Sequence, residues 1–281
     1  MLFCLIFILV THPVTAKEKV TVGLLDLNYL PYQKIENSRA VGSDSDIVRE
    51  AFSRFQNYDF VYWLLPFKRS VQDIVSGEID VSVGLLPSAY DEHVLFTDVP
   101  LHVSEYKLTV LKGKEFKYRS MEDLVNKRLS LIRAPSINSE LDEYLAAGKL
   151  SIFRNKNAEM QLNMLTLGRV DALIGNTEVT TYTAKKMGLE DKITFIPHST
   201  LGQFEFHIII SKNSKIVDLV GFHQTLREVL HDMEVDGTIE KIYRKHNLSS
   251  SRFETDGRRD VDIESMLTDR IQSNFKQQIE Q

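Results

Sequence analysis

Short apolar runs alternate with amphipathic stretches over most of the chain. A run of consecutive apolar residues is typical of a buried strand, whereas apolar residues at every third or fourth position indicate a helix. By these criteria the first part of the chain predicts a strand at 20–25, a helix at 44–55, a strand at 60–64, a helix at 67–76 that ends at Gly77, and a strand at 80–83. This alternation predicts an α/β fold with a largely parallel sheet.

One unit of this pattern occurs twice. Residues 76–84 and 167–175 share a helix end, a glycine, an apolar residue followed by Asp, a short apolar strand and a closing glycine. The flanking elements match as well, and they are a strand at 128–132 and helices at 138–147 and 160–167. The repetition predicts two similar α/β halves.

Two further segments predict connections between these halves. Residues 106–111 lead out of the first half, and residues 204–210 lead out of the second. Amphipathic helices are expected afterwards at 216–233 and 238–245. The chain is therefore expected to return to the first half, which makes a hinge of two strands.

Residues 1–16 predict a secretory signal. A short apolar run ends in the small-residue pattern Val14-Thr15-Ala16, which predicts cleavage after Ala16, although a basic segment before the run is missing. The alternative is a buried N-terminal strand. Cys4, the single cysteine, lies inside this segment, so the rest of the chain excludes disulfides and cysteine-ligated metal sites. We expect no metal and no cofactor.

Charge and hydropathy narrow the function classes. No later segment approaches the ~20 consecutive apolar residues of a membrane-spanning helix. The net charge of −5 argues against nucleic acid as a partner.

The tail after the serines at 249–251 has a pattern of its own. Apolar residues recur at every fourth position and predict one amphipathic helix: Ile263, Leu267, Ile271, Phe275 and Ile279. This helix either packs on the body, stays loose or docks on a partner.

The order of several motifs resembles the family 3 extracellular solute-binding proteins, from about Val20 to Leu248. The motifs of the first half are 26–32, 42–48, 65–69, 76–80 and 96–100, and those of the second half are 120–124, 168–172 and 186–193. Each motif alone is weak, and the ordered set is specific.

This resemblance implies the periplasmic binding protein type 2 fold, with two mixed-sheet lobes joined by a two-strand hinge. We expect a signal peptide at 1–16, a first lobe at 17–108, a second lobe at 109–204, a return segment of the first lobe at 205–248 and a tail at 249–281. It also implies a periplasmic monomer that closes on a small amino-acid-like or organic acid solute and delivers it to the membrane permease of an ABC importer.

The resemblance places the site in the cleft between the lobes. Tyr29 and Phe67 match aromatic positions that sandwich the ligand, and Asp26 matches a polar contact. Core packing of Phe67 and loop capping by Asp26 are the alternatives. Gly84 matches a point where the backbone approaches the ligand.

The usual clamp for a ligand carboxylate is missing. Amino-acid binders of the family that the chain resembles hold this carboxylate with a hydroxyl residue and an arginine. Leu86 stands at the position of the hydroxyl residue, and residues 90–93, where the arginine would be, contain none. Arg69 and Arg133 are the candidate replacements, because a guanidinium suits a carboxylate, although each also fits a solvated surface position. Ser136 and Asn138 lie at the start of the next helix, where backbone N–H groups can bind an anion.

A second departure from the family pattern is Asn176. Amino-acid binders commonly carry an aspartate here for the ligand's ammonium group, and Asn176 offers no charge. Glu178 either supplies that charge or favours the helix N-terminus. An altered amino acid, an organic acid, a small peptide-like compound and a polyamine-like cation all remain open as ligands.

Two other functions fit the same fold. One is a sensory subunit that presents its ligand to a membrane receptor. The other is a dehydratase acting on prephenate-like or arogenate-like acids, with Glu178 or Asp26 as a general acid. Because no Ser-His-Asp, metal-spaced His or phosphate-loop pattern is present, we expect binding without catalysis.

Overall fold

The computed structural model describes residues 17–26, 28–84, 88–132 and 138–248, so the predicted signal segment and the tail helix lie outside the described residues. The elements up to the first crossing are β1 (Glu18–Leu25), β2 (Lys34–Glu36), β3 (Arg39–Val41), α1 (Ser43–Ser53), β4 (Tyr58–Leu65), α2 (Phe67–Ser76), β5 (Val81–Gly84), β6 (Val94–Phe96) and β7 (His102–Leu111). The next are β8 (Arg128–Ile132), α3 (Ser139–Ala146), β9 (Ser151–Asn155), α4 (Ala158–Thr166), β10 (Ala172–Asn176), α5 (Thr177–Lys186) and β11 (Ile193–Phe195). The last are β12 (Gly202–Ser211), α6 (Leu219–Val235) and α7 (Thr238–Lys245).

Within the described residues, ten strands form one sheet that consists of two mixed halves. Its main order is β4-β1-β5-β12-β7-β10-β8-β9, with β6 beside β12 and β11 beside β7. β1 is parallel to β4 and β5, and β8 is parallel to β9 and β10. β12 and β7 are antiparallel to these parallel sets. We call the half around β1 the first lobe and the half around β8 the second lobe.

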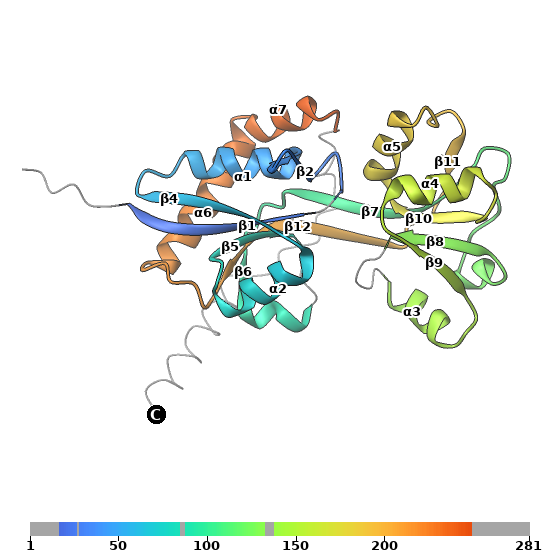
Figure 1. Ribbon diagram of the computed structural model, residues 1–281, viewed down its shortest axis with the longest axis horizontal. Helices are drawn as coiled ribbons and strands as arrows, with labels where there is room; N and C mark the ends of the chain where they lie inside the picture. Colours follow the sequence, from blue (N-terminus) through green and yellow to red (C-terminus); the bar gives the residue numbers. More distant parts are fainter. Residues whose placement is uncertain (1–16, 27, 85–87, 133–137, 249–281) are drawn as a thin grey trace, which may run out of the picture. The chain divides into compact units, whose positions relative to one another are not determined.

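β7 and β12 connect the two lobes. They pair with each other in antiparallel register, from Gly202 opposite Tyr106 to Phe206 opposite His102. Each strand then continues into one lobe, β7 beside β10 and β12 beside β5 (Figure 1). This arrangement confirms the predicted two-strand hinge. The expected lobe boundaries at 108/109 and 204/205 fall inside these two strands, which both lobes share.

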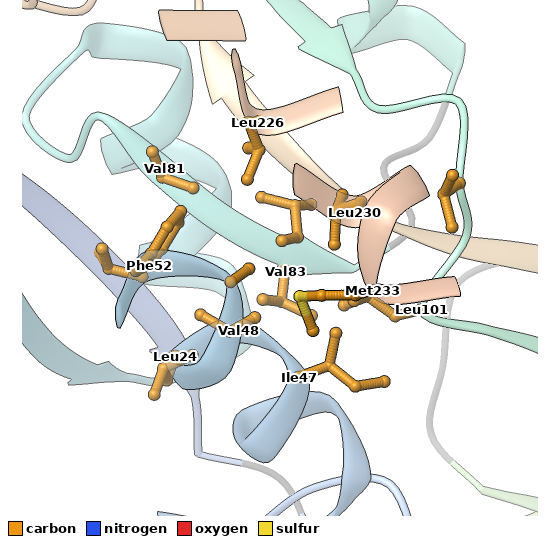
Figure 2. Close-up of a cluster of buried hydrophobic side chains, with 14 of the residues drawn as sticks. Leu24, Ile47, Val48, Phe52, Val81, Val83, Leu101, Leu226, Leu230 and Met233 are labelled. Atoms are coloured by element: carbon orange, nitrogen blue, oxygen red, sulfur yellow. The ribbon is translucent and has the colours of Figure 1, made fainter. Parts of the chain in front are cut away.

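Each lobe has apolar cores on both faces of its sheet. In the first lobe, Ile208 and Ile210 face a large core under α1, α6 and α7, whereas Ile209 faces a smaller core under α2. This is the alternation of side chains along a strand. Figure 2 shows the large core, in which Phe52 of α1 and Leu226 of α6 pack over the strands.

The second lobe follows the same rule. Ala172 and Ile174 of β10 belong to a core beneath α3, and Leu173 between them belongs to a core beneath α4 and α5. At roughly 25 cal/mol per Å² of buried apolar area, such cores supply most of the favourable free energy of folding.

The repeated motif plays the same structural role in both lobes. The Asp80 carboxylate accepts a hydrogen bond from the backbone N–H of Thr21 at 2.8 Å. The Asp171 carboxylate accepts one from the backbone N–H of Arg128, also at 2.8 Å. Each Asp therefore ties the start of its own strand to the neighbouring parallel strand, which explains the repeat in the sequence.

Most predicted elements occur within one or two residues of their expected bounds. Two elements differ more: β7 begins at His102 and not at 106, and α6 begins at Leu219 and not at 216. The Asp218 side chain caps α6 by accepting a hydrogen bond from the N–H of Gly221 at 2.9 Å. Across the described stretches, no helix is both long and apolar enough to cross a bilayer.

Candidate functional site

The candidate site lies where the loops of the first lobe meet the second lobe. Ala158 and Val179 of the second lobe are buried in the same apolar cluster as the strands of the first lobe. Ile132, at the carboxyl end of β8, packs against that cluster too. Ligands of open α/β sheets generally bind beyond the carboxyl ends of the strands, which is where these contacts occur.

Tyr29 lies at this junction and is fixed by a tight turn. Its backbone N–H donates to the Gln33 carbonyl at 2.8 Å, and its carbonyl accepts from Tyr32 at 3.0 Å. The Tyr29 and Tyr106 hydroxyls are 2.7 Å apart, so the first-lobe loop is bonded directly to hinge strand β7. Burial of the hydroxyl, reinforced by Tyr106, raises the pKa of Tyr29 well above its usual value.

A stack of rings continues along the hinge from Tyr29. The His102 ring lies between Tyr32 and Phe206, with centroid distances of 3.6 Å and 4.4 Å. The Nδ1 atom of His102 is 2.9 Å from the Asp44 carboxylate, and both side chains are buried. Because β7 begins with His102 and Asp44 lies in the first turn of α1, this pair anchors the hinge to the first lobe.

Glu178 contacts the opposite lobe. Burial and then the charge of Glu178 raise the pKa of Tyr32, with a hydrogen bond between the two side chains adding to the effect. The Glu178 carboxylate also accepts a hydrogen bond from the Thr177 hydroxyl at 2.5 Å. Glu178 therefore lies in the first turn of α5, as one of the two expected roles requires, and close to Tyr32 of the first lobe.

Asn176 is buried at the end of β10, where it caps α5. Its Oδ1 atom accepts a hydrogen bond from the Val179 N–H at 2.9 Å. Its Nδ2 atom is buried and has no hydrogen-bond partner among the described residues. Across the sheet, Asn176 is the register partner of Tyr106. A buried amide donor therefore lies one strand away from the Tyr29 contact.

Three predicted site residues of the first lobe lie at or just after the carboxyl ends of its strands. Phe67 is half-buried at the first position of α2, and Asp26 is exposed directly after β1. Gly84 ends β5 with a φ of 147°, a conformation that side-chain-bearing residues rarely adopt. Asp26 and Phe67 therefore follow the carboxyl ends of β1 and β4, and Gly84 is the last residue of β5.

Arg69 is paired within its own helix in this structure. Its Nε atom donates to the Asp73 carboxylate at 2.7 Å, one turn along the same helix, and its side chain is 60% exposed. This is the solvated helix position that the sequence left open. A ligand role for Arg69 would use the N–H donors of its two Nη atoms or require this pair to separate.

Asn138 is engaged at both ends of its amide. It caps α3 by accepting from the Leu141 N–H at 2.8 Å, and its Nδ2 atom donates to the Leu201 carbonyl at 2.7 Å. Arg133 and Ser136 lie outside the described residues. Among the residues that are described, no group of three His, Cys, Asp or Glu is placed to hold a metal ion.

A small hollow lies between the Asn28–Leu30 loop of the first lobe and helices α4 and α5 of the second. Its lining combines amide, hydroxyl and charged groups with few apolar side chains: Asn28, Leu30, Ala158, Glu159, Tyr182, Thr183 and Lys186. Polar groups of both lobes therefore border the junction.

The model of the family "Bacterial extracellular solute-binding proteins, family 3" matches residues 20–249. The chain belongs to this family. Membership makes solute binding its function class. A comparison with curated proteins found no match.

Solved structures of similar fold include further solute-binding proteins. An ancestral arginine-binding protein bound to arginine has a TM-score of 0.64 and 21% identity, covering 83% of this chain and 99% of that chain. A putative L-cystine ABC transporter from Listeria monocytogenes has a TM-score of 0.64 and 21% identity, with 84% and 100% covered. A histidine kinase sensor domain similar to periplasmic binding proteins has a TM-score of 0.63 and 17% identity, with 82% and 96% covered. These likenesses confirm the fold of this family 3 protein.

Sequence reasoning missed the contacts along the hinge. Tyr106 was expected only as a strand residue, and the pair of His102 with Asp44 was not expected at all. A polar residue at an inward-facing strand position is a usable signal, because a buried polar group needs a partner. That signal identifies His102 when the strand is known to begin there. Its partner Asp44 is far away in the sequence and is found only in the structure.

Proposed function

We propose that this protein captures a small polar solute between its lobes in the periplasm and delivers it to the permease of an ABC importer. The observation that carries the proposal is the meeting of Tyr29 and Tyr106 at the hinge, beside the contact of Tyr32 with Glu178. Groups from the first-lobe loop, the hinge and the second lobe thus converge on one junction. Family membership and the similarity to arginine-binding and cystine-transport proteins support this function.

In the proposed mechanism, the lobes rotate about β7 and β12 and close on the solute. A solute that contacts both lobes binds the closed state better than the open one, and so shifts the population toward closure. Tyr29 and Phe67 would supply aromatic surface, while Asp26, Gly84, Asn176 and Glu178 would supply polar contacts. Arg133, Ser136 and Asn138 would complete the second-lobe side, and Arg69 would join through its Nη atoms or after leaving Asp73.

A thermal-shift screen of the purified protein against amino acids, organic acids and polyamines tests this proposal. A ligand at a hundredfold excess over its Kd stabilises the folded state by about 2.7 kcal/mol. A hit should raise Tm in a concentration-dependent way, and Tyr29→Ala should lower the affinity by about tenfold or more. Lack of any hit across the library would argue against solute capture.

We also propose that the protein releases its solute chemically unchanged. An ultraviolet assay with prephenate and arogenate tests this part directly. Turnover above that of a Glu178→Gln variant would identify an enzyme and overturn the binding-only proposal.

Sensing is the second candidate, because a histidine kinase sensor domain shares the fold. Solute capture would be the same, and only the membrane partner would differ. A pull-down from membranes, with the full chain and with a chain lacking residues 263–279, separates the two. Recovery of a permease supports import, whereas recovery of a receptor kinase or cyclase that requires the tail supports sensing.

A further inference from the structure

We propose that Asn176 selects a solute with a carbonyl oxygen in place of an amino group, and that α-keto acids are the class it favours. This inference rests on the proposed function, since it assigns a ligand class to the same junction. It follows from the orientation of the Asn176 amide and from the missing hydrogen-bond acceptor for its Nδ2 atom.

The polarity of the Asn176 amide is fixed by its cap. The Val179 N–H donates to Oδ1 at 2.9 Å, so the carbonyl end of the amide must face the helix. Rotating the amide by half a turn would place two N–H donors against each other and leave Val179 without an acceptor. The end that faces away from the helix is therefore always the donor Nδ2.

That donor lacks a partner although the side chain is buried. Asn176 is 3% exposed, and Nδ2 has no hydrogen-bond partner within residues 17–26, 28–84, 88–132 and 138–248. Buried amide groups in folded proteins are almost always paired, so an unpaired one calls for an explanation. A ligand atom that accepts its hydrogen bond supplies that explanation.

The other asparagine caps of the second lobe show that the free donor is not a general property of such caps. Asn138 holds α3 with the same Oδ1 contact, and its Nδ2 donates to the Leu201 carbonyl at 2.7 Å. Asn157 holds α4 through Met160 and is only half-buried, so water reaches it. Of these three caps, Asn176 alone is both buried and unpaired at Nδ2.

The position of Asn176 in the sheet places its amide beside the hinge strand at the junction. Asn176 ends β10 opposite Tyr106, whose hydroxyl contacts Tyr29 of the first lobe. An aspartate in the same cap would use one oxygen for the helix and offer the second to an ammonium group. Asn176 offers an N–H instead, which repels an ammonium and pairs with a carbonyl oxygen.

Glu178 does not restore an ammonium site. Its carboxylate already accepts from the Thr177 hydroxyl and interacts with the Tyr32 hydroxyl across the lobes. An ammonium would have to share this carboxylate with the two hydroxyls, whereas a carbonyl oxygen makes no demand on it. An α-keto acid has the carboxylate and side chain of the matching amino acid and differs in the group that would face Asn176.

Calorimetric titration with matched pairs tests the inference: glutamate with α-ketoglutarate, phenylalanine with phenylpyruvate, and leucine with α-ketoisocaproate. The unmodified protein should bind at least one keto acid roughly tenfold or more tightly than the matching amino acid. The amino acid cannot accept the hydrogen bond of the buried Asn176 Nδ2, and its ammonium group is repelled by that N–H. Asn176→Asp should reverse that preference. Asn157→Asp, a matched change in a half-buried cap of the same lobe, should leave it unchanged.

The inference is overturned if the unmodified protein prefers the amino acid, or if Asn176→Asp still prefers the keto acid. Binding is observed in both cases, so the proposal of solute capture stands. Binding of neither series also overturns it, and solute capture then stands or falls with the wider screen. If Asn176→Asp does not fold, Asn176→Ser keeps an oxygen for the Val179 N–H and removes the amide donor. It should weaken keto-acid binding about tenfold, and unchanged affinity overturns the inference.

Discussion

His102 and Asp44 form a hydrogen-bonded pair at 2.9 Å in which both side chains are almost wholly buried. The pair joins a hinge strand to the first turn of α1, and the His102 ring is stacked on both sides. The remaining ring nitrogen of His102 lies 3.2 Å from the Ser104 hydroxyl. The polar atoms of this ring are thus satisfied inside an aromatic stack, which fixes the start of β7.

Breaking this pair should be costly. Asp44→Ala leaves the His102 ring buried without its carboxylate, and we expect a loss of about 3 kcal/mol in the free energy of unfolding. Urea denaturation followed by circular dichroism measures it. Arg244→Ala, which breaks the exposed pair with Glu240, is the control and should leave the midpoint unchanged. Equal midpoints for the two variants would contradict the structural role of the buried pair.

The Tyr29 and Tyr106 hydroxyls should be energetically coupled. We expect Tyr29→Phe and Tyr106→Phe each to destabilise the protein, and the double variant to lose about 1 kcal/mol less than the sum. The double-mutant cycle is measured by urea denaturation. Strictly additive losses would mean that the hydroxyls do not interact in solution.

The repeated aspartates should differ in their contribution to stability. Asp80 is buried and also accepts from the Ser214 hydroxyl at 2.7 Å, whereas the Asp171 side chain is 36% exposed. We expect Asp80→Ala to cost about 2–3 kcal/mol, because several buried donors lose their acceptor. Asp171→Ala should cost clearly less. A larger loss for Asp171→Ala in thermal or urea unfolding would refute this ranking.

His223 should make the protein less stable in mild acid. Burial lowers the pKa of His223 below its usual 6.5, and Nε2 lies 2.8 Å from the Phe96 carbonyl, to which only a protonated nitrogen donates. The unfolded chain therefore binds a proton at a higher pH than the folded one. The contribution is fully present above pH 6.5 and is lost as pH falls below it toward the folded pKa.

His223→Gln keeps a donor for Phe96 and removes the titration. Urea midpoints between pH 7.5 and 5 should fall less steeply for this variant than for the unmodified protein. Parallel curves would assign the acid sensitivity to other groups.

The helices and strands could be predicted because their signals are local. Helices 67–76 and 238–245 and strand 128–132 have the expected bounds, since apolar spacing and caps determine them. The short hairpin of β2 and β3 was not predicted, because three-residue strands carry little periodic signal.

The site was harder to predict than the fold. Resemblance pointed to Tyr29, Asn176 and Glu178, and the structure places all three at the junction of the lobes. The free donor of Asn176 depends on a cap, a burial and a missing partner, and none of these is visible in residue identity. The same holds for Arg69, whose bond to Asp73 depends on a choice of side-chain rotamer.

The register of the hinge strands makes the second lobe one continuous fragment whose two ends lie side by side. Tyr106 and Gly202 are direct partners, so the roughly hundred residues between them enter and leave through adjacent positions. Neighbouring termini are the condition under which a module can be excised, joined by a short linker or inserted into another protein. A fragment that starts in β7 and ends in β12 therefore meets this condition for transfer into another protein.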